Sequence, residues 1–165
     1  KLVLFKLKEL KFSGNAKILP YILDLLDKND SSDITQEILN LIRDLRDQQC
    51  VPVIADYINK NMQGNYIGDV ISSCWQSRLD FHAHLNTFAT CFLYSDYQTS
   101  LEAFTVIEEM LWKSSNNQIE SCKEILMKND SKISDEKQPL YKELIKVIDQ
   151  GKSNNQDMYP DLYEQ

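Results

Sequence analysis

Apolar residues recur along this chain at steps of three and four positions, in segments separated by short polar stretches. This spacing places the apolar side chains on one face of a helix and predicts amphipathic α-helices. The four glycines and four prolines are few, whereas a β-protein needs turn residues about every eight to twelve positions. We therefore predict helices over residues 16–28, 34–47, 50–60, 65–78, 81–93, 97–112, 116–128 and 135–150.

The first four segments form two copies of one pattern, in which residue 19 aligns with residue 51. Over residues 19–29 and 51–61, proline, aspartate, lysine and asparagine coincide and the apolar positions match in type. The helices that follow keep the same offset through three pairs: Ile34 with Tyr66, Ile38 with Val70 and Ile42 with Cys74. Internal repetition of this length is typical of arrays of helix pairs.

A third copy is aligned by apolar spacing alone. Its first helix matches the second copy at a slightly larger offset, through Leu85, Phe88 and Phe92. Its second helix places three residues at the core positions at a slightly smaller offset: Tyr97, Leu101 and Thr105. A fourth pair carries two apolar stripes: Ile119, Cys122, Ile125 and Leu126, then Leu140, Leu144, Ile145 and Ile148.

We predict one domain over residues 1–150 in which neighbouring helix pairs stack and share a core. Its copies cover about residues 16–47, 50–78, 81–112 and 116–150. For residues 1–12 we favour a helix over an extended segment. Gly151 is expected to end the last helix, and residues 151–165 form a polar, mobile tail. Candidate helix caps are Asp33 in the first copy and Asp80 or Asp96 in the third.

This pattern resembles the HEAT and armadillo-type α-solenoids. The resemblance is carried by the paired amphipathic helices and by the openings Leu19-Pro20 and Val51-Pro52. A fainter similarity to uncharacterised bacterial HEAT-like proteins lies in residues 74–77 and 79–81. The family's ladder of basic residues in the second helices is met only by Arg43. The resemblance implies an all-α, right-handed superhelix of about four helix pairs, whose second helices line a concave protein-binding face.

Charge is spread unevenly along the chain. Residues 14–111 hold six basic and fourteen acidic residues, a net charge of −8, within a total of −7. Such a surface repels phosphate backbones, so nucleic acid is not the expected partner. The predicted outward positions of the second helices are polar and mostly acidic: Glu37, Asn40, Asp44, Asp69, Ser73, Gln76, Glu102 and Glu109. We therefore expect a partner protein or peptide with a basic surface; the plainer alternative is a face that is only solvated.

The four cysteines, Cys50, Cys74, Cys91 and Cys122, lack the two-residue gap of metal-binding and redox motifs. We predict reduced core thiols, which are typical of a cytoplasmic protein. No apolar run reaches the length that spans a bilayer, so no membrane association is expected. Trp75 and Trp112 follow second helices closely, where they either pack between repeats or, if exposed, anchor a partner.

Catalytic chemistry finds little support in these residues. His82 and His84 are two positions apart, so on a helix their side chains diverge and joint metal ligation is awkward. We expect a non-enzymatic scaffold without metal or cofactor. Two alternatives remain: an enzyme or ligand-binding protein with a pocket near Cys74, His82 and His84, and a homo-oligomeric module in which the aromatic tail docks on a neighbour.

Overall fold

The structure is a computed structural model that describes residues 16–158, with side chains described as far as residue 151. Regular structure in this range is entirely helical, and no β-strand occurs between residues 16 and 158, which confirms the predicted all-α class. The helix expected over residues 1–12 and the end of the tail, residues 159–165, lie outside the described residues.

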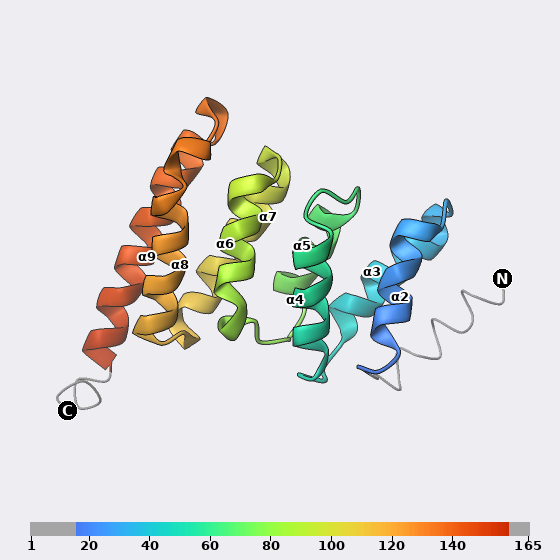
Figure 1. Ribbon diagram of the computed structural model, residues 1–165. Helices are drawn as coiled ribbons and strands as arrows, with labels where there is room; N and C mark the ends of the chain where they lie inside the picture. Colours follow the sequence, from blue (N-terminus) through green and yellow to red (C-terminus); the bar gives the residue numbers. More distant parts are fainter. Residues whose placement is uncertain (1–15, 159–165) are drawn as a thin grey trace. The chain divides into compact units, whose positions relative to one another are not determined.

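The described part of the chain holds eight α-helices and four short 3₁₀ segments. The α-helices are α2 (Leu19–Lys28), α3 (Ser32–Asp44), α4 (Cys50–Lys60), α5 (Ile67–Gln76), α6 (Leu85–Tyr94), α7 (Tyr97–Met110), α8 (Asn116–Lys128) and α9 (Gln138–Met158) (Figure 1). The 3₁₀ segments are η1 (His82–His84), η2 (Leu111–Lys113), η3 (Asp130–Lys132) and η4 (Asp135–Lys137). The predictions for residues 50–60 and 116–128 match α4 and α8 at both ends.

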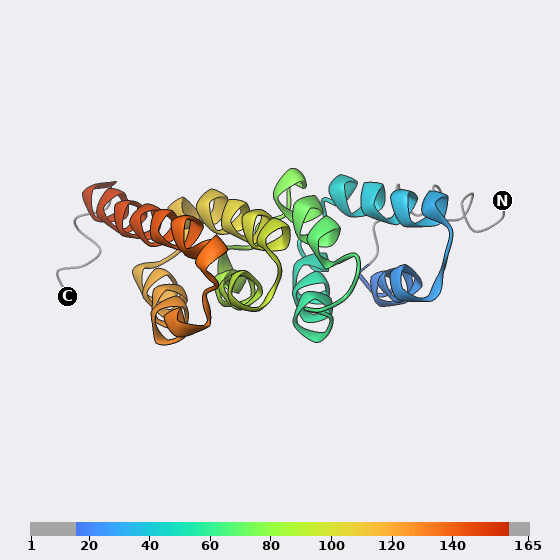
Figure 2. The same ribbon diagram turned by 90° about the horizontal axis from the view of Figure 1, so that it is seen from above.

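The chain divides into two compact units, with the boundary between Phe81 and His82. In the first unit, α2 packs against α3 and α4, and α5 packs against α3 and α4. In the second unit, α6 packs against α7 and α8, and α9 packs against α7 and α8. Within each unit the even-numbered helices therefore form one layer and the odd-numbered helices the other (Figure 2). The predicted single domain over residues 1–150 stays a prediction.

Buried positions on the even-numbered helices recur in a constant pattern. Helix α2 buries Leu19, Ile22, Leu23 and Leu26, and the aligned residues of α4 are also buried: Val51, Ile54, Ala55 and Ile58. The same spacing leads to the buried residues of α6: Leu85, Phe88, Ala89 and Phe92. In α8 it leads to Ile119, Cys122 and Leu126. The core positions predicted for the first helix of the third copy are thus confirmed.

The predicted core of α7 is wrong. Tyr97 and Leu101 are exposed and Thr105 is half-buried, whereas Ala103, Phe104, Val106 and Ile107 are buried. These four align with the buried residues of α5, Val70, Ile71, Ser73 and Cys74, two positions away from the predicted register. A shift of two residues turns an α-helix by about 200°, which moves a core position to the opposite side. The alignment fails there because apolar spacing alone set it, and the exposed Tyr97 and Leu101 have the same four-residue spacing as a buried stripe.

Helix starts show one correct cap prediction and one wrong one. Asp96 caps α7, and its carboxylate accepts a hydrogen bond of 2.8 Å from the backbone amide of Thr99. Asp33 lies in the first turn of α3 instead of at its cap, which is Ser31. A carboxylate in the first turn still favours the helix, because it faces the positive end of the helix dipole.

The prediction that Gly151 ends the last helix is wrong, because α9 continues to Met158. Part of the segment expected as a mobile tail is therefore helical. A Cβ atom at position 151 would lie 3.1 Å from Cδ1 and 3.2 Å from Cβ of Leu111, a buried residue of η2. Glycine at this position lets α9 approach η2 closely; it is a packing residue and not a helix stop.

A buried lysine connects η4 to the junction of α6 and α7. The Lys137 side chain is only 5% exposed, and its Nζ donates hydrogen bonds to three carbonyl oxygens, of Phe92 (2.8 Å), Leu93 (3.0 Å) and Ser95 (2.9 Å). The last carbonyls of a helix have no partner within the helix, and the ammonium group supplies one for the end of α6. Burial lowers the pKa of Lys137, although the charge of Asp96 acts in the opposite direction.

Candidate functional site

Five of the predicted partner-binding residues reach the surface on the odd-numbered helices of the first unit. Asp44, Asp69 and Gln76 are exposed, and Glu37 and Asn40 are half-buried. The side-chain oxygen of Asn40 accepts hydrogen bonds from Arg43 (2.9 Å) and Gln36 (3.2 Å). This oxygen is therefore held by its own helix, and the carboxylates are the better candidates for contact with a partner.

Ser73 does not belong to this surface, so its predicted outward position is wrong. It is fully buried, and its hydroxyl donates a hydrogen bond of 2.8 Å to the backbone carbonyl of Asp69. Its neighbours on the same face of α5 are Val70 and Cys74, which are also fully buried. Polarity predicts an outside position for a serine, but its hydroxyl can be satisfied by the preceding turn of its own helix and so be buried.

The two remaining predicted residues, Glu102 and Glu109, lie on α7 of the second unit. Glu109 is exposed and Glu102 is half-buried, with its carboxylate accepting a hydrogen bond of 3.2 Å from the amide of Gln98. The same helix carries a third acidic residue, Glu108, which is exposed. Helix α7 thus presents three carboxylates without a basic residue in its sequence.

Exposed apolar residues accompany these carboxylates. Tyr97 is 40% exposed, Leu101 is 36% exposed and Trp112, in the adjoining η2, is 62% exposed. Their separations of four and eleven residues are close to whole helical turns, so the three side chains follow one side of α7 and η2. We call these three residues the α7 stripe. Large apolar side chains at a surface cost solvation and often mark binding sites.

The first unit also has an exposed tryptophan near the end of an odd-numbered helix. Trp75 lies near the end of α5 and is 39% exposed, beside the exposed Gln76. Trp75 and Trp112 are thus both exposed and not packed in the core. Sequence reasoning misses Tyr97 and Leu101 as surface residues because the misaligned third copy puts them in the core; their separation by four residues could have indicated a second apolar face.

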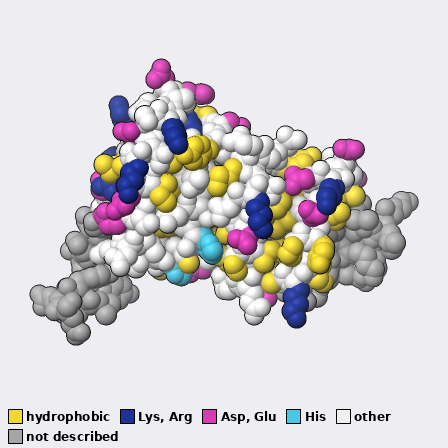
Figure 3. Space-filling model, viewed as in Figure 1, with side chains coloured by type: hydrophobic (Ala, Val, Ile, Leu, Met, Phe, Trp, Pro, Cys, Tyr) yellow, Lys and Arg dark blue, Asp and Glu magenta, His cyan; other side chains and the backbone are white. Residues whose placement is uncertain are grey.

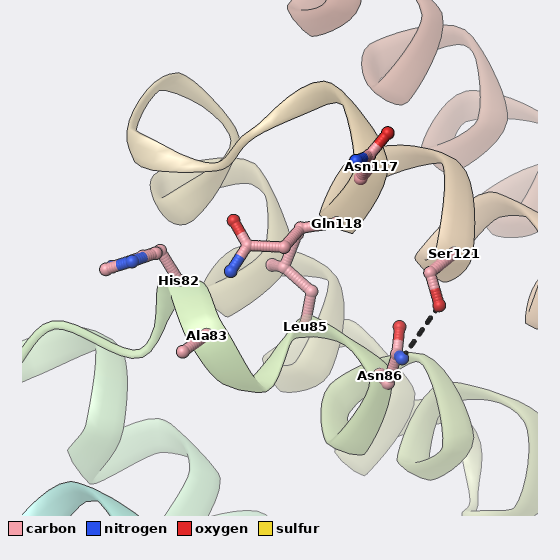
Figure 4. A pocket seen from close by; sticks show the side chains of 7 residues that line it. All are labelled: His82, Ala83, Leu85, Asn86, Asn117, Gln118 and Ser121. Carbon is pink, nitrogen blue, oxygen red and sulfur yellow. Dashed lines mark hydrogen bonds between the residues drawn. The ribbon is translucent and has the colours of Figure 1, made fainter.

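A pocket of about 200 Å³ lies in the second unit, where η1, α6 and α8 meet (Figure 4). His82 contributes the only titratable group of its lining, and Asn86 faces Ser121 across the helices with a hydrogen bond of 2.9 Å. The rest of the lining is Ala83, Leu85, Asn117 and Gln118. A lining with one imidazole can hydrogen-bond a polar molecule, but it offers no acid–base or nucleophile–base pair.

The residues of the predicted catalytic alternative are not brought together in this pocket. His84 does not line it, and Cys74 is a buried residue of the first unit. All four cysteines are free and buried, as predicted. Burial raises the pKa of the Cys91 and Cys122 thiols to about 12, so these two are protonated at neutral pH. Within residues 16–151, where side chains are described, no three His, Cys, Asp or Glu side chains are grouped as a metal site requires.

Comparison of the chain with protein-family models, with curated protein sequences and with solved structures gives no match. Within the described range, no helix combines the length and the apolar character that crossing a membrane requires.

Proposed function

We propose that this chain is a non-enzymatic, protein-binding scaffold that holds a basic partner protein or peptide on its odd-numbered helices. The observation that carries the proposal is the α7 stripe, three exposed apolar residues in line along one helix and its end. Tryptophan and tyrosine are among the residues that most often dominate binding energy at protein interfaces. A stripe at helical spacing offers such anchors to an extended or helical segment of a partner.

The charges beside the stripe indicate the kind of partner. Glu102, Glu108 and Glu109 accompany it on α7, and the first unit carries Asp44 and Asp69 on its own odd-numbered helices. Carboxylates around an apolar centre favour lysine and arginine at the rim of an interface and disfavour acidic partners. We therefore expect a segment that carries both apolar and basic side chains.

The proposal extends to the architecture: we infer that the helix pairs continue as one HEAT-like, right-handed α-solenoid. It is supported by the packing that both units share, in which even-numbered helices contact each other and odd-numbered helices contact each other. The buried positions that recur in register from α2 to α8 support it as well. In such an array the odd-numbered helices would line the concave face. Four reduced, buried thiols also fit a cytoplasmic compartment.

Selection of peptides from a random display library against the full chain tests this function. We expect enriched peptides to combine basic and apolar residues, and we expect Trp112→Ser to weaken the best peptide about ten-fold or more, as loss of a central anchor does. The matched control is Met127→Ser, since Met127 is 54% exposed but lies on an even-numbered helix. Equal binding by both variants, or enrichment of acidic peptides, would remove the support for this surface.

A further inference from the structure

A groove of about 290 Å³ lies between α2 and α4, on the even-numbered layer of the first unit. Its apolar walls include Leu23, Val53 and the ring of Tyr57. In the space-filling view, apolar side chains lie together with both acidic and basic ones over these two helices, toward the right of the picture (Figure 3). The groove belongs wholly to the first unit, so its shape depends only on helices that contact each other directly.

The polar part of the lining is predominantly negative. The lining holds three carboxylates, of Asp24, Asp27 and Asp56, and the ammonium group of Lys60. Asp24 is already paired with Lys28 on its own helix, which leaves the carboxylates of Asp27 and Asp56 for a ligand. Asp27 accepts a hydrogen bond of 3.1 Å from the hydroxyl of Tyr57, which fixes the ring at the side of the groove. Burial, followed by the charge and hydrogen bond of Asp27, raises the pKa of Tyr57, so the hydroxyl stays a neutral donor.

Two carboxylates at one repeat position distinguish this pair of helices. Asp24 and Asp56 occupy the same position in the first two copies of the repeat. The equivalent position in α6, where Phe88 aligns with Ile54, is held by Thr90, a neutral residue. A contact between neighbouring even-numbered helices is thus common to both units, but α2 and α4 carry two carboxylates at this position, where α6 and α8 carry one, Glu124.

We propose that this groove binds a positively charged side chain, an arginine or lysine presented by a peptide segment of a partner protein. Leu23 and Val53 would cover the methylene stem, which such side chains bury while the charged end stays polar. The carboxylates of Asp27 and Asp56 would pair with the charged end, and the Tyr57 ring adds a face suited to a cation. The site is independent of the α7 stripe, so either can fail without the other.

The test is a titration of the ¹⁵N-labelled full chain with the dipeptide acetyl-Arg-Arg-amide, followed by NMR. The expected result is a set of amide shift changes centred on α2 and α4. The neutral analogue acetyl-citrulline-citrulline-amide has nearly the same shape and is expected to cause none. Shift changes centred elsewhere, or equal changes with the neutral analogue, would overturn the proposal.

Variants test the contribution of the carboxylates. We expect Asp27→Asn with Asp56→Asn to weaken the dipeptide about five-fold, which is the effect of losing two partly exposed ion pairs. The matched control is Asp30→Asn with Asp33→Asn, two exposed residues of the same unit outside the groove lining. Lys60→Gln removes the opposing cation and is expected to strengthen binding, a gain that an unfolded variant cannot produce.

Equal weakening by the groove pair and the control pair would show a general effect of net charge and overturn the site. Spermidine serves as a second probe, because a free polyamine carries positive charge without a peptide. If spermidine shifted the same amides at lower concentration than the dipeptide, the assignment of a peptide as the occupant would be wrong.

Discussion

At the scale of the residue, Lys137 is the most consequential side chain of the second unit. A lysine is rarely buried without partners, and this one has three carbonyl acceptors at the end of α6, with the ring of Phe92 5.7 Å from its Nζ. These carbonyls belong to residues 92–95, more than forty positions earlier in the chain. The single side chain therefore holds together segments that are distant in sequence.

We predict that Lys137→Met lowers the free energy of unfolding by about 2 kcal/mol, because three carbonyl oxygens lose the hydrogen bond from its ammonium group and only the Ser100 hydroxyl still donates to that of Phe92 at 2.9 Å. The change in unfolding free energy of the second unit is measured by urea unfolding in a Trp75→Phe background, where the fluorescence of Trp112 reports on that unit. Lys142→Met, at an exposed position of α9, is the matched control. Equal midpoints for the two variants would show that the buried hydrogen bonds contribute nothing to stability.

At the scale of the element, α7 depends on its N-terminal cap. Hydrogen bonds from Thr99, chiefly from its backbone amide, lower the pKa of Asp96, and the charge of Lys137 acts in the same direction. The folded-state pKa therefore lies below the ordinary value of 3.8. The stability that this shift contributes is fully present above 3.8 and is lost as the pH falls through the folded-state pKa.

We predict that Asp96→Asn makes the stability of the protein less sensitive to acid. Asparagine caps a helix about as well as aspartate but does not titrate, so the cap survives protonation of the other carboxylates. Urea unfolding at about pH 5 and about pH 3 gives the change in unfolding free energy across the acid range. Asp30→Asn removes the same charge from an exposed position and should keep the wild-type dependence; a slope unchanged in Asp96→Asn would argue against the cap's role.

Most elements were predictable because their cores follow a simple period. Helices α4 and α8 begin and end where the apolar spacing begins and ends, and the first two copies of the repeat share their buried positions in α2 and α4. The errors have local causes. Glycine is a poor helix former, which predicts that the helix ends at Gly151. Inside α9, however, the absence of a side chain at Gly151 lets the helix approach Leu111 closely. Ser73 shows that a polar residue can belong to the core face when its own helix accepts its hydrogen bond.

At the scale of the whole molecule, the two tryptophans report on different units, Trp75 on the first and Trp112 on the second. The proposed surface was predictable in charge but not in its apolar centre. The acidic residues of α7 can be read directly from the sequence. The exposure of Tyr97 and Leu101 depends on which side of α7 faces the core, and the misaligned third copy predicts the opposite side. The groove between α2 and α4 could not be predicted from the sequence, because it forms only where the two helices pack against each other.

We predict that both units unfold together, as expected if the helix pairs form one stacked array whose neighbours stabilise each other. Trp112→Phe leaves the fluorescence of the first unit, and Trp75→Phe leaves that of the second. Coincident urea midpoints in the two variants would agree with a single cooperative array. Separate midpoints would mean that the units fold independently and would contradict the proposed continuous solenoid.

The position of Lys137 also has a consequence for biosynthesis. A ribosome makes α6 and α7 long before residue 137 leaves it, and until then the carbonyls at the end of α6 have no lysine to bind. Completion of the second unit is thus coupled to translation well past α7. A product that stops before residue 137 exposes this helix end, which is a feature that quality-control proteases and chaperones can distinguish from the finished protein.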